Sequence, residues 1–194
     1  MAETKRSSVY QLAMCAVMAA VLCVLGPLAV PIGPVPITCG TLGIYLTAYL
    51  LGGKWAAVST LVYLLVGLVG APVFSGYMGG ISRLIGPTGG YLIGYLPMAL
   101  IAGWVISLTA QRLDLSSKTG LTLVYALQFL GMVAATAVLY TFGTAWYCIE
   151  AEVGLEKALT ACVLPFIPFD LLKIVITMVI GVPIRWRLEQ TGLL

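Results

Sequence analysis

Two charged residues, Asp170 and Lys173, lie in the apolar segment PFIPFDLLKIVITMVIG towards the C-terminus of the chain. A spacing of three residues puts both side chains on one face of a helix. A charged group in an apolar segment is costly unless it pairs with another charge or faces a polar cavity. The pair therefore has two interpretations: a structural ion pair, with the lysine reaching towards the membrane surface, or a site that binds a polar solute.

A single basic residue, Arg83, stands in the otherwise neutral stretch from Gly70 to Gly94, which contains eight glycines. A guanidinium can bind a carboxylate through two parallel hydrogen bonds, and glycines let backbone N–H groups approach a ligand. The same features equally suit a surface arginine among turns. GPTGG in this stretch lacks the GK[ST] ending of a phosphate-binding loop, and the chain has no Walker motif, so it is not expected to hydrolyse ATP itself.

Weaker candidates for a ligand site are Thr38, Thr88, Tyr91 and Gln128. Aromatic residues in apolar segments belong more often to interfacial belts or to packing. The chain has no histidine, and its five cysteines are widely spaced, most of them in apolar segments. This pattern offers no evident nucleophile and base, metal site or disulfide framework. We therefore expect a binding protein without a catalytic residue, a metal or a cofactor.

The composition places these residues in a membrane protein. The 194 residues are 61% hydrophobic and only 9% charged, with a mean hydropathy of +1.07, whereas about 25% of a soluble domain is charged. Since one crossing takes about 20 apolar residues, the chain can form about six transmembrane helices in one all-α domain, 1–194. The apolar runs predict these helices at residues 9–27, 38–52, 55–71, 89–110, 121–147 and 160–184.

The charge distribution predicts the orientation of this bundle. With the N-terminus inside the cell, most basic residues fall on the inner side and the acidic residues of the last loop on the outer side. The inner set is Lys5, Arg6, Lys54, Arg112, Lys118, Arg185 and Arg187, and the outer set is Arg83, Lys157, Glu150, Glu152 and Glu156. We expect a multi-pass plasma-membrane protein with both termini in the cytoplasm. Its dispersed basic residues give no footprint for nucleic acid.

Two of the predicted outer loops, 27–38 and 71–92, are nearly uncharged and rich in proline or glycine. Non-helical backbone with apolar side chains is tolerated at membrane depth where protein buries it or where it lines a cavity. We expect these loops to fold back over the outer end of the bundle and to cap a ligand pocket.

Small residues form a stripe on the first predicted helix, at Ala13, Ala16 and Ala20. Such a stripe lets another helix approach closely. The spacing alone is compatible with packing inside this bundle and with the docking of a partner.

Four segments resemble the BioY family: GPVPIT (33–38), PVFSGYMGG (72–80), GPTGGYLIGY (86–95) and FIPFDLLKIV (166–175). They occur in order and span most of the chain. One departure is that BioY sequences often read PVPITLQT where this chain has PVPITCGT, so that Gly40 stands in place of a common glutamine.

This resemblance implies a six-helix S-component of an energy-coupling factor (ECF) transporter, which binds biotin from outside the cell. Transport then depends on separate partners, a transmembrane T-component and two ATPases. In such a protein, Asp170 and Lys173 correspond to ligand-site residues, while Ala16 and Ala20 correspond to the surface that docks the T-component.

Our hypothesis for the ligand follows from the chemistry of biotin. Asp170 accepts hydrogen bonds from the ureido N–H groups, while Lys173 or Arg83 neutralises the carboxylate, and the opposite orientation is also open. Two alternatives remain: an S-component for another vitamin, and a stand-alone permease or channel in which the charged pair relays protons or ions.

Overall fold

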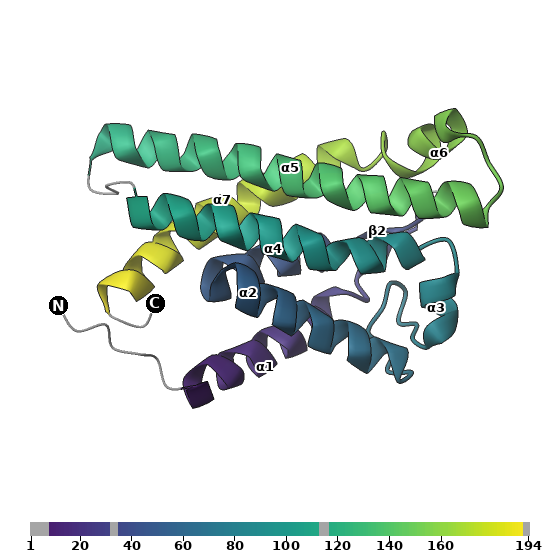
Figure 1. The fold of residues 1–194 in the computed structure, drawn as a ribbon, viewed down its shortest axis with the longest axis horizontal. Helices are drawn as coiled ribbons and strands as arrows, with labels where there is room; N and C mark the ends of the chain where they lie inside the picture. The colour runs from purple at the N-terminus through teal and green to yellow at the C-terminus, as the bar shows by residue number, and fades with distance from the viewer. Residues whose placement is uncertain (1–7, 32–34, 113–116, 192–194) are drawn as a thin grey trace.

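The computed structural model describes residues 8–31, 35–112 and 117–191, which form a bundle of roughly aligned helices (Figure 1). Lys5, Arg6 and the first residues of the GPVPIT segment lie outside the described residues. The long helices are α1 (Ser8–Leu25), α2 (Gly40–Leu68), α4 (Gly89–Arg112), α5 (Lys118–Glu150) and α7 (Ile167–Gln190). The short elements are β1 (Ala29–Val30), β2 (Ile37–Thr38), α3 (Ile81–Ile85) and α6 (Leu155–Cys162).

The short elements gather towards one end of the bundle, on the right in Figure 1. Helix α1 begins and helix α7 ends at the left-hand end. We call the end with α3, α6 and the β1–β2 hairpin the loop end, and the other the opposite end. The short elements α3, α6, β1 and β2 are therefore gathered at the loop end, where they can cover the space between the long helices.

Helix α2 contains a reversal of the chain at Gly52, whose φ of 74° and ψ of 177° are not helical. The first arm, residues 40–51, runs beside α7 from the loop end to the opposite end. Near its end, the carbonyl of Tyr49 accepts a 2.9 Å hydrogen bond from Arg185 in the last part of α7. The positive φ explains why glycine occupies the turn, since a Cβ would strain this backbone.

The second arm of α2, residues 53–68, returns to the loop end beside α1. Ser59 donates to the carbonyl of Cys15 at 3.0 Å, and Tyr63 donates to the carbonyl of Val73 at 3.1 Å in the loop that follows. The two arms correspond to the helices predicted at 38–52 and 55–71.

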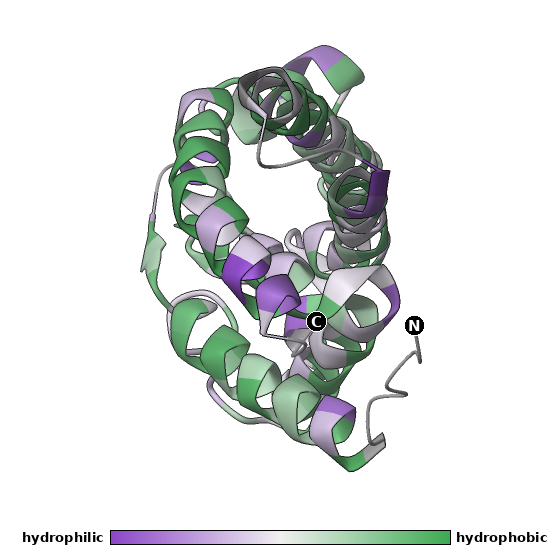
Figure 2. Ribbon diagram, turned by 90° about the vertical axis from the view of Figure 1, so that its left-hand side faces the viewer, coloured by the Kyte–Doolittle hydropathy of each residue, from purple (hydrophilic) through white to green (hydrophobic). Residues whose placement is uncertain are grey.

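Among the described residues, α2 (both arms taken together), α4, α5 and α7 are long and apolar enough to cross a membrane by length and composition, and α1 is a shorter apolar helix. In these four helices, 33–50% of the most apolar window is buried, so much apolar surface faces outward. Figure 2 shows hydrophobic residues along the helices and hydrophilic ones where α7 ends. The predicted class, an all-helical polytopic membrane protein, is confirmed. Six crossings remain a prediction, which α1, the two arms of α2, α4, α5 and α7 would supply.

The last predicted helix, 160–184, is interrupted in the structure, because α6 ends at Cys162 and α7 begins at Ile167. Pro165 lies in the interval, and proline removes a backbone donor and disfavours helical conformation in the residue before it. Pro168, in contrast, occupies the first turn of α7, where the missing N–H costs nothing.

Both uncharged loops fold onto the loop end, as predicted. The first forms the β1–β2 hairpin. The second carries Phe74, whose ring packs edge-on against Tyr63 with 5.7 Å between centroids. The N–H of Gly76 in the second loop donates to the carbonyl of Pro27 in the first, at 3.0 Å. The two loops are thus tied together above the helices.

Candidate ligand-binding site

A cavity opens at the loop end between the long helices and beneath the two loops. Its cavity volume is about 50 Å³, below the about 300–1,000 Å³ that is typical of small-molecule sites, and its empty space together with the open solvent at its mouth is about 600 Å³. Its apolar walls include Val35, Ile37, Phe74, Leu92, Leu139 and Phe166. Its polar lining includes Thr38, Thr41, Ser75, Thr88, Tyr91, Tyr95, Tyr140, Asp170 and Lys173.

Asp170 and Lys173 share one face of α7, as the spacing predicts, and both side chains line the cavity. The ammonium nitrogen of Lys173 lies 2.8 Å from Oδ1 of Asp170. Only 6% of Asp170 is exposed. Removing either partner would leave a charge without compensation in an apolar environment, which is strongly destabilising.

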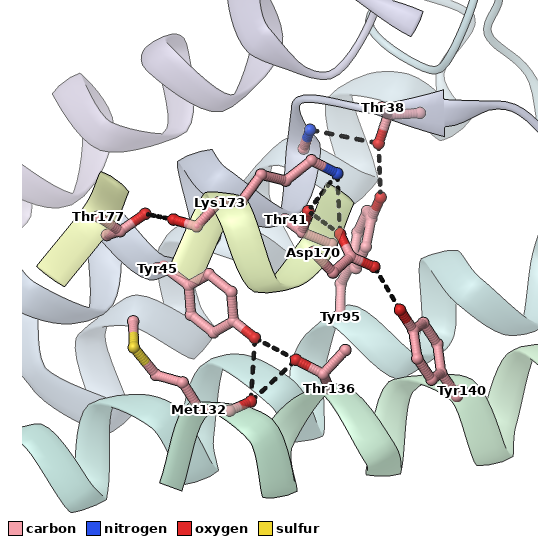
Figure 3. Close-up of polar contacts among 11 residues, drawn as sticks. Thr38, Thr41, Tyr45, Tyr95, Met132, Thr136, Tyr140, Asp170, Lys173 and Thr177 are labelled. Carbon is pink, nitrogen blue, oxygen red and sulfur yellow. Dashed lines mark hydrogen bonds and ion pairs between the residues drawn. The ribbon is translucent and has the colours of Figure 1, made fainter. Parts of the chain in front are cut away.

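Two further residues complete this charged pair, and the sequence did not single them out. Thr41 of α2 donates to Oδ1 of Asp170 at 3.2 Å and accepts from Lys173 at 3.1 Å. Tyr140 of α5 donates to Oδ2 of Asp170 at 2.7 Å. Figure 3 shows the four side chains converging from three helices on one point. We call this group of Thr41, Tyr140, Asp170 and Lys173 the charged cluster.

The charged cluster has positions to spare for a ligand. A carboxylate accepts about four hydrogen bonds, two on each oxygen, and an ammonium donates three. Oδ1 of Asp170 receives Lys173 and Thr41, whereas Oδ2 receives Tyr140 alone. Lys173 gives hydrogen bonds to Asp170 and to Thr41. One acceptor position on Oδ2 and one donor position on the ammonium therefore remain within the cluster.

Thr38 lies on another part of the cavity wall, opposite a tyrosine from α4. Its hydroxyl lies 3.2 Å from the hydroxyl of Tyr95 and accepts from the N–H of Gly40 at 3.2 Å. A Cβ on Gly40 would lie 2.9 Å from the Tyr95 hydroxyl. Gly40, where BioY sequences often have glutamine, thus leaves room for this contact between Thr38 and Tyr95.

A second polar layer closes the space on the side of the opposite end. Tyr45, one turn after Thr41 on α2, donates to the carbonyl of Met132 at 3.0 Å and makes a short hydrogen bond with Thr136. Tyr45 is fully buried. Its contacts with α5, drawn in Figure 3, separate the charged cluster from the interior of the bundle.

Thr88 and Tyr91, two of the weaker ligand-site candidates, line the cavity, but each hydroxyl already has a protein partner. Thr88 donates to the carbonyl of Arg83 at 3.3 Å, and Tyr91 donates to the carbonyl of Cys162 at 2.7 Å. The ring of Tyr91 also contacts Phe166 edge-on at 6.1 Å. These contacts hold the ends of α4 and α6 against the cavity.

Arg83 and Gln128 are not among the residues that line the cavity. Arg83 lies in the last turn of α3, half-buried and next to the rim through its bond with Thr88. Gln128 is buried in α5, where it accepts from Tyr49 at 2.7 Å and donates to Thr109 at 2.9 Å. The structure therefore brings neither to the charged cluster.

The alanine stripe of α1 faces away from the bundle. Ala13, Ala16 and Ala20 are exposed, whereas Cys15 and Ala19 on the other face are buried. Packing among the described residues therefore leaves Ala16 and Ala20 exposed.

Comparison with known proteins places this geometry in a family. The family model described as the BioY family matches residues 1–190. The chain belongs to the BioY family. The biotin transporter BioY2 of Lactococcus lactis is 31% identical over 188 residues, covering 97% of each chain. The biotin transporter BioY of Thermotoga maritima is 31% identical, covering 90% of this chain and 95% of that one.

A solved structure agrees with this membership of the BioY family. The crystal structure of an S-component for biotin from an ECF-type ABC transporter superposes with a TM-score of 0.80. It is 30% identical, and the match covers 95% of each chain. These relatives are transporters or transporter subunits, so this BioY protein belongs with transport proteins and not with enzymes.

Proposed function

We propose that this chain is a biotin-specific S-component, which captures biotin in the loop-end cavity for uptake driven by a separate ATP-hydrolysing module. The observation that carries the proposal is the charged cluster, held in the wall of a cavity that is lined by both apolar and polar residues. The BioY relatives and the S-component structure support the choice of biotin.

Biotin has chemical groups that are complementary to the apolar walls and to the hydrogen-bonding groups of this cavity. Its bicyclic body is apolar and suits walls such as Phe74, Leu92 and Phe166. In its ureido group, an N–H donor stands beside a carbonyl acceptor. The spare positions of the charged cluster, an acceptor on Asp170 and a donor on Lys173, supply the complementary acceptor and donor. A ureido group bound here would satisfy both without breaking the ion pair.

The carboxylate of biotin would then point towards the mouth of the cavity, where Arg83 stands next to the rim. The guanidinium would attract a carboxylate there. In the reverse orientation, the carboxylate binds Lys173, and the ureido group lies near Thr38 and Tyr95. Desthiobiotin keeps the ureido group and biotin methyl ester lacks the charged carboxylate, so their affinities for the Lys173→Met and Arg83→Gln variants would identify which end binds where.

The partners that we propose are a T-component and two ATPases, with Ala16 and Ala20 as part of the docking surface. The exposure of this small-residue face on α1 supports the assignment. For the orientation, we propose a cytoplasmic opposite end. The basic residues Arg112, Lys118 and Arg187 near this end support it under the positive-inside rule. The cavity would then open to the outside of the cell.

The decisive experiment is calorimetry of biotin binding to the purified chain in detergent, with thiamine and riboflavin as competitors. Asp170→Asn is expected to weaken binding by about 100-fold, because it removes one member of a buried charged contact. Glu189→Gln is the matched control, since it also neutralises a carboxylate in an ion pair, 2.9 Å from Arg185 at the opposite end. Absence of biotin binding by folded protein would refute the ligand assignment.

The alternatives predict different outcomes in the same preparations. Stronger binding of thiamine or riboflavin than of biotin would indicate an S-component for another vitamin. Proton-coupled uptake into liposomes that contain no ATPase would indicate a stand-alone permease, with Asp170 and Lys173 as the relay.

A further inference from the structure

A second recess lies between the beginning of the second arm of α2 and the second half of α4, on the side of the opposite end. It is lined by Gly53, Lys54, Leu100, Ile101, Trp104 and Ser107. Its empty space, together with the open solvent at its mouth, is about 810 Å³. We call it the Lys54 groove. It shares no lining residue with the loop-end cavity, and it has no part in the binding of biotin proposed above.

The walls of the Lys54 groove face outward and are largely apolar. Leu100 and Trp104, one turn apart on α4, are 44% and 64% exposed. The floor is formed where the two helices touch, since a Cβ on Gly103 would lie 2.5 Å from the nitrogen of Gly53. In a helix bundle that spans the bilayer, such an outward apolar surface is in contact with lipid chains.

The polar side of the groove is cationic. Lys54 is exposed, and within the described ranges neither of the two ion pairs involves it. The Ser107 side chain lies beside the turn, with its hydroxyl 3.0 Å from the Cβ position of Gly52. The groove thus combines an ammonium and a hydroxyl with an apolar trough, which is complementary to a phosphate attached to an acyl chain.

The depth of the groove agrees with this chemistry. Trp55, next to Lys54, lies beside Cys15, whose thiol contacts its carbonyl at 3.9 Å. Cys15 is two turns from the start of α1, so Lys54 lies near the end of the transmembrane bundle. Lysine and tryptophan are favoured at this level because their polar tips reach the headgroup region while the rest of the side chain stays in the apolar layer.

We propose that the Lys54 groove binds an anionic phospholipid, with the phosphate at Lys54 and Ser107 and an acyl chain along Leu100 and Trp104. A basic residue near the membrane surface favours an anionic lipid by about fivefold. A zwitterionic lipid carries its own cation, which competes with Lys54 for the phosphate. The groove therefore selects by charge as well as by shape.

Quenching of Trp104 fluorescence by brominated acyl chains tests this proposal. The protein is placed in phosphatidylcholine bilayers that contain an equal small fraction of dibrominated phosphatidylglycerol or dibrominated phosphatidylcholine. The Trp104 contribution is the difference between the wild type and Trp104→Phe. We expect the anionic lipid to quench this contribution more strongly, with an apparent preference of about fivefold.

Two variants connect the preference to the groove. Lys54→Gln is expected to remove the excess quenching by phosphatidylglycerol. Arg187→Gln removes another exposed basic residue of the same end, outside the groove, and is expected to leave the excess unchanged. Equal quenching by the two lipids in the wild type, or an excess that survives in Lys54→Gln, would overturn the proposal. No quenching by either lipid would also overturn it, because protein would then cover the groove. Biotin is absent throughout, so the result is independent of the proposed ligand.

Discussion

Tyr140 of α5 donates a 2.7 Å hydrogen bond to Oδ2 of Asp170, an oxygen that the ion pair with Lys173 leaves free. The two residues are 30 positions apart in the sequence. This bond fixes the rotation of the carboxylate, so that the remaining lone pair of Oδ2 keeps one direction. The direction in which Asp170 would accept a hydrogen bond from a ligand at the proposed site therefore depends on α5 as well as on α7.

Tyr140→Phe is expected to weaken biotin binding by about tenfold, since a hydrogen bond to a charged group contributes about 1.5–3 kcal/mol, part of which water can replace. Calorimetry on the purified variant measures this effect. Tyr125→Phe is the control, because Tyr125 is a half-buried tyrosine of the same helix outside the cavity. An equal affinity of Tyr140→Phe and wild type would show that the hydrogen bond from Tyr140 to Asp170 does not contribute to binding.

Thr41→Val is expected to weaken biotin binding and to lower thermal stability. The substitution keeps the shape of the side chain but removes the hydroxyl, which donates a hydrogen bond to Asp170 and accepts one from Lys173. Loss of one partner from a buried polar contact costs about 1–3 kcal/mol. Thr47→Val in the same arm of α2 is the comparison, since its hydroxyl bonds only to the carbonyl of Gly43 in its own helix. If both variants behaved alike, the loss would reflect threonine packing and not the charged cluster.

A double variant separates structural from ligand-binding roles of the ion pair. Asp170→Asn alone leaves the ammonium of Lys173 partly buried without its counter-charge and is expected to lower the thermal midpoint. Adding Lys173→Met removes that charge, and neutral replacement of a buried pair often restores stability. We expect the double variant to regain stability but to bind biotin no better than Asp170→Asn. Recovery of affinity together with stability would show that the pair acts only in folding.

Much of this site follows from local sequence rules, and the remainder does not. Asp170 and Lys173 were predicted to share a face because three residues along a helix nearly complete one turn. Tyr140 and Thr41 were missed, since each lies in an apolar helix where single polar residues are common. Only the packing of α2 and α5 against α7 brings them to the carboxylate. Likewise, Gln128 was a plausible candidate by type, but its position on α5 directs it to Tyr49 and Thr109.

The fold shows the same division. The apolar runs 38–52 and 55–71 predict two separate helices, and in the structure the chain reverses between two arms of α2 at Gly52. The break between α6 and α7 was not predicted, although Pro165 marks it, because the surrounding residues remain apolar and read as one continuous segment. Apolar side chains indicate that a segment lies in the membrane. The residue at which a helix ends depends instead on the backbone N–H groups that form its hydrogen bonds, and proline lacks one.

Gly52→Ala tests the chain reversal in α2. Its φ of 74° with an extended ψ is a conformation that side chains rarely adopt, so a Cβ there is expected to cost about 1–3 kcal/mol. Gly154→Ala is the control, because Gly154 has a negative φ and no atom within 4 Å of its Cβ position. Thermal unfolding in detergent compares them. A midpoint for Gly52→Ala equal to that of Gly154→Ala would contradict the turn seen here.

Ala20→Leu tests the docking of the T-component on α1. Because Ala20 is exposed, the larger side chain is expected to leave folding and biotin affinity unchanged, while it prevents the close approach of a partner helix. Uptake of labelled biotin by cells that supply the T-component and ATPases is expected to fall at least about tenfold, since steric overlap in a packed interface costs about 1–3 kcal/mol. Ala126→Leu makes the same change at an exposed position of α5 and should transport normally. Equal uptake by the two variants would exclude the face of Ala16 and Ala20 from the docking surface. A fall in the biotin affinity of Ala20→Leu would mean that the substitution lowers uptake by disturbing the ligand cavity and not the docking of a partner.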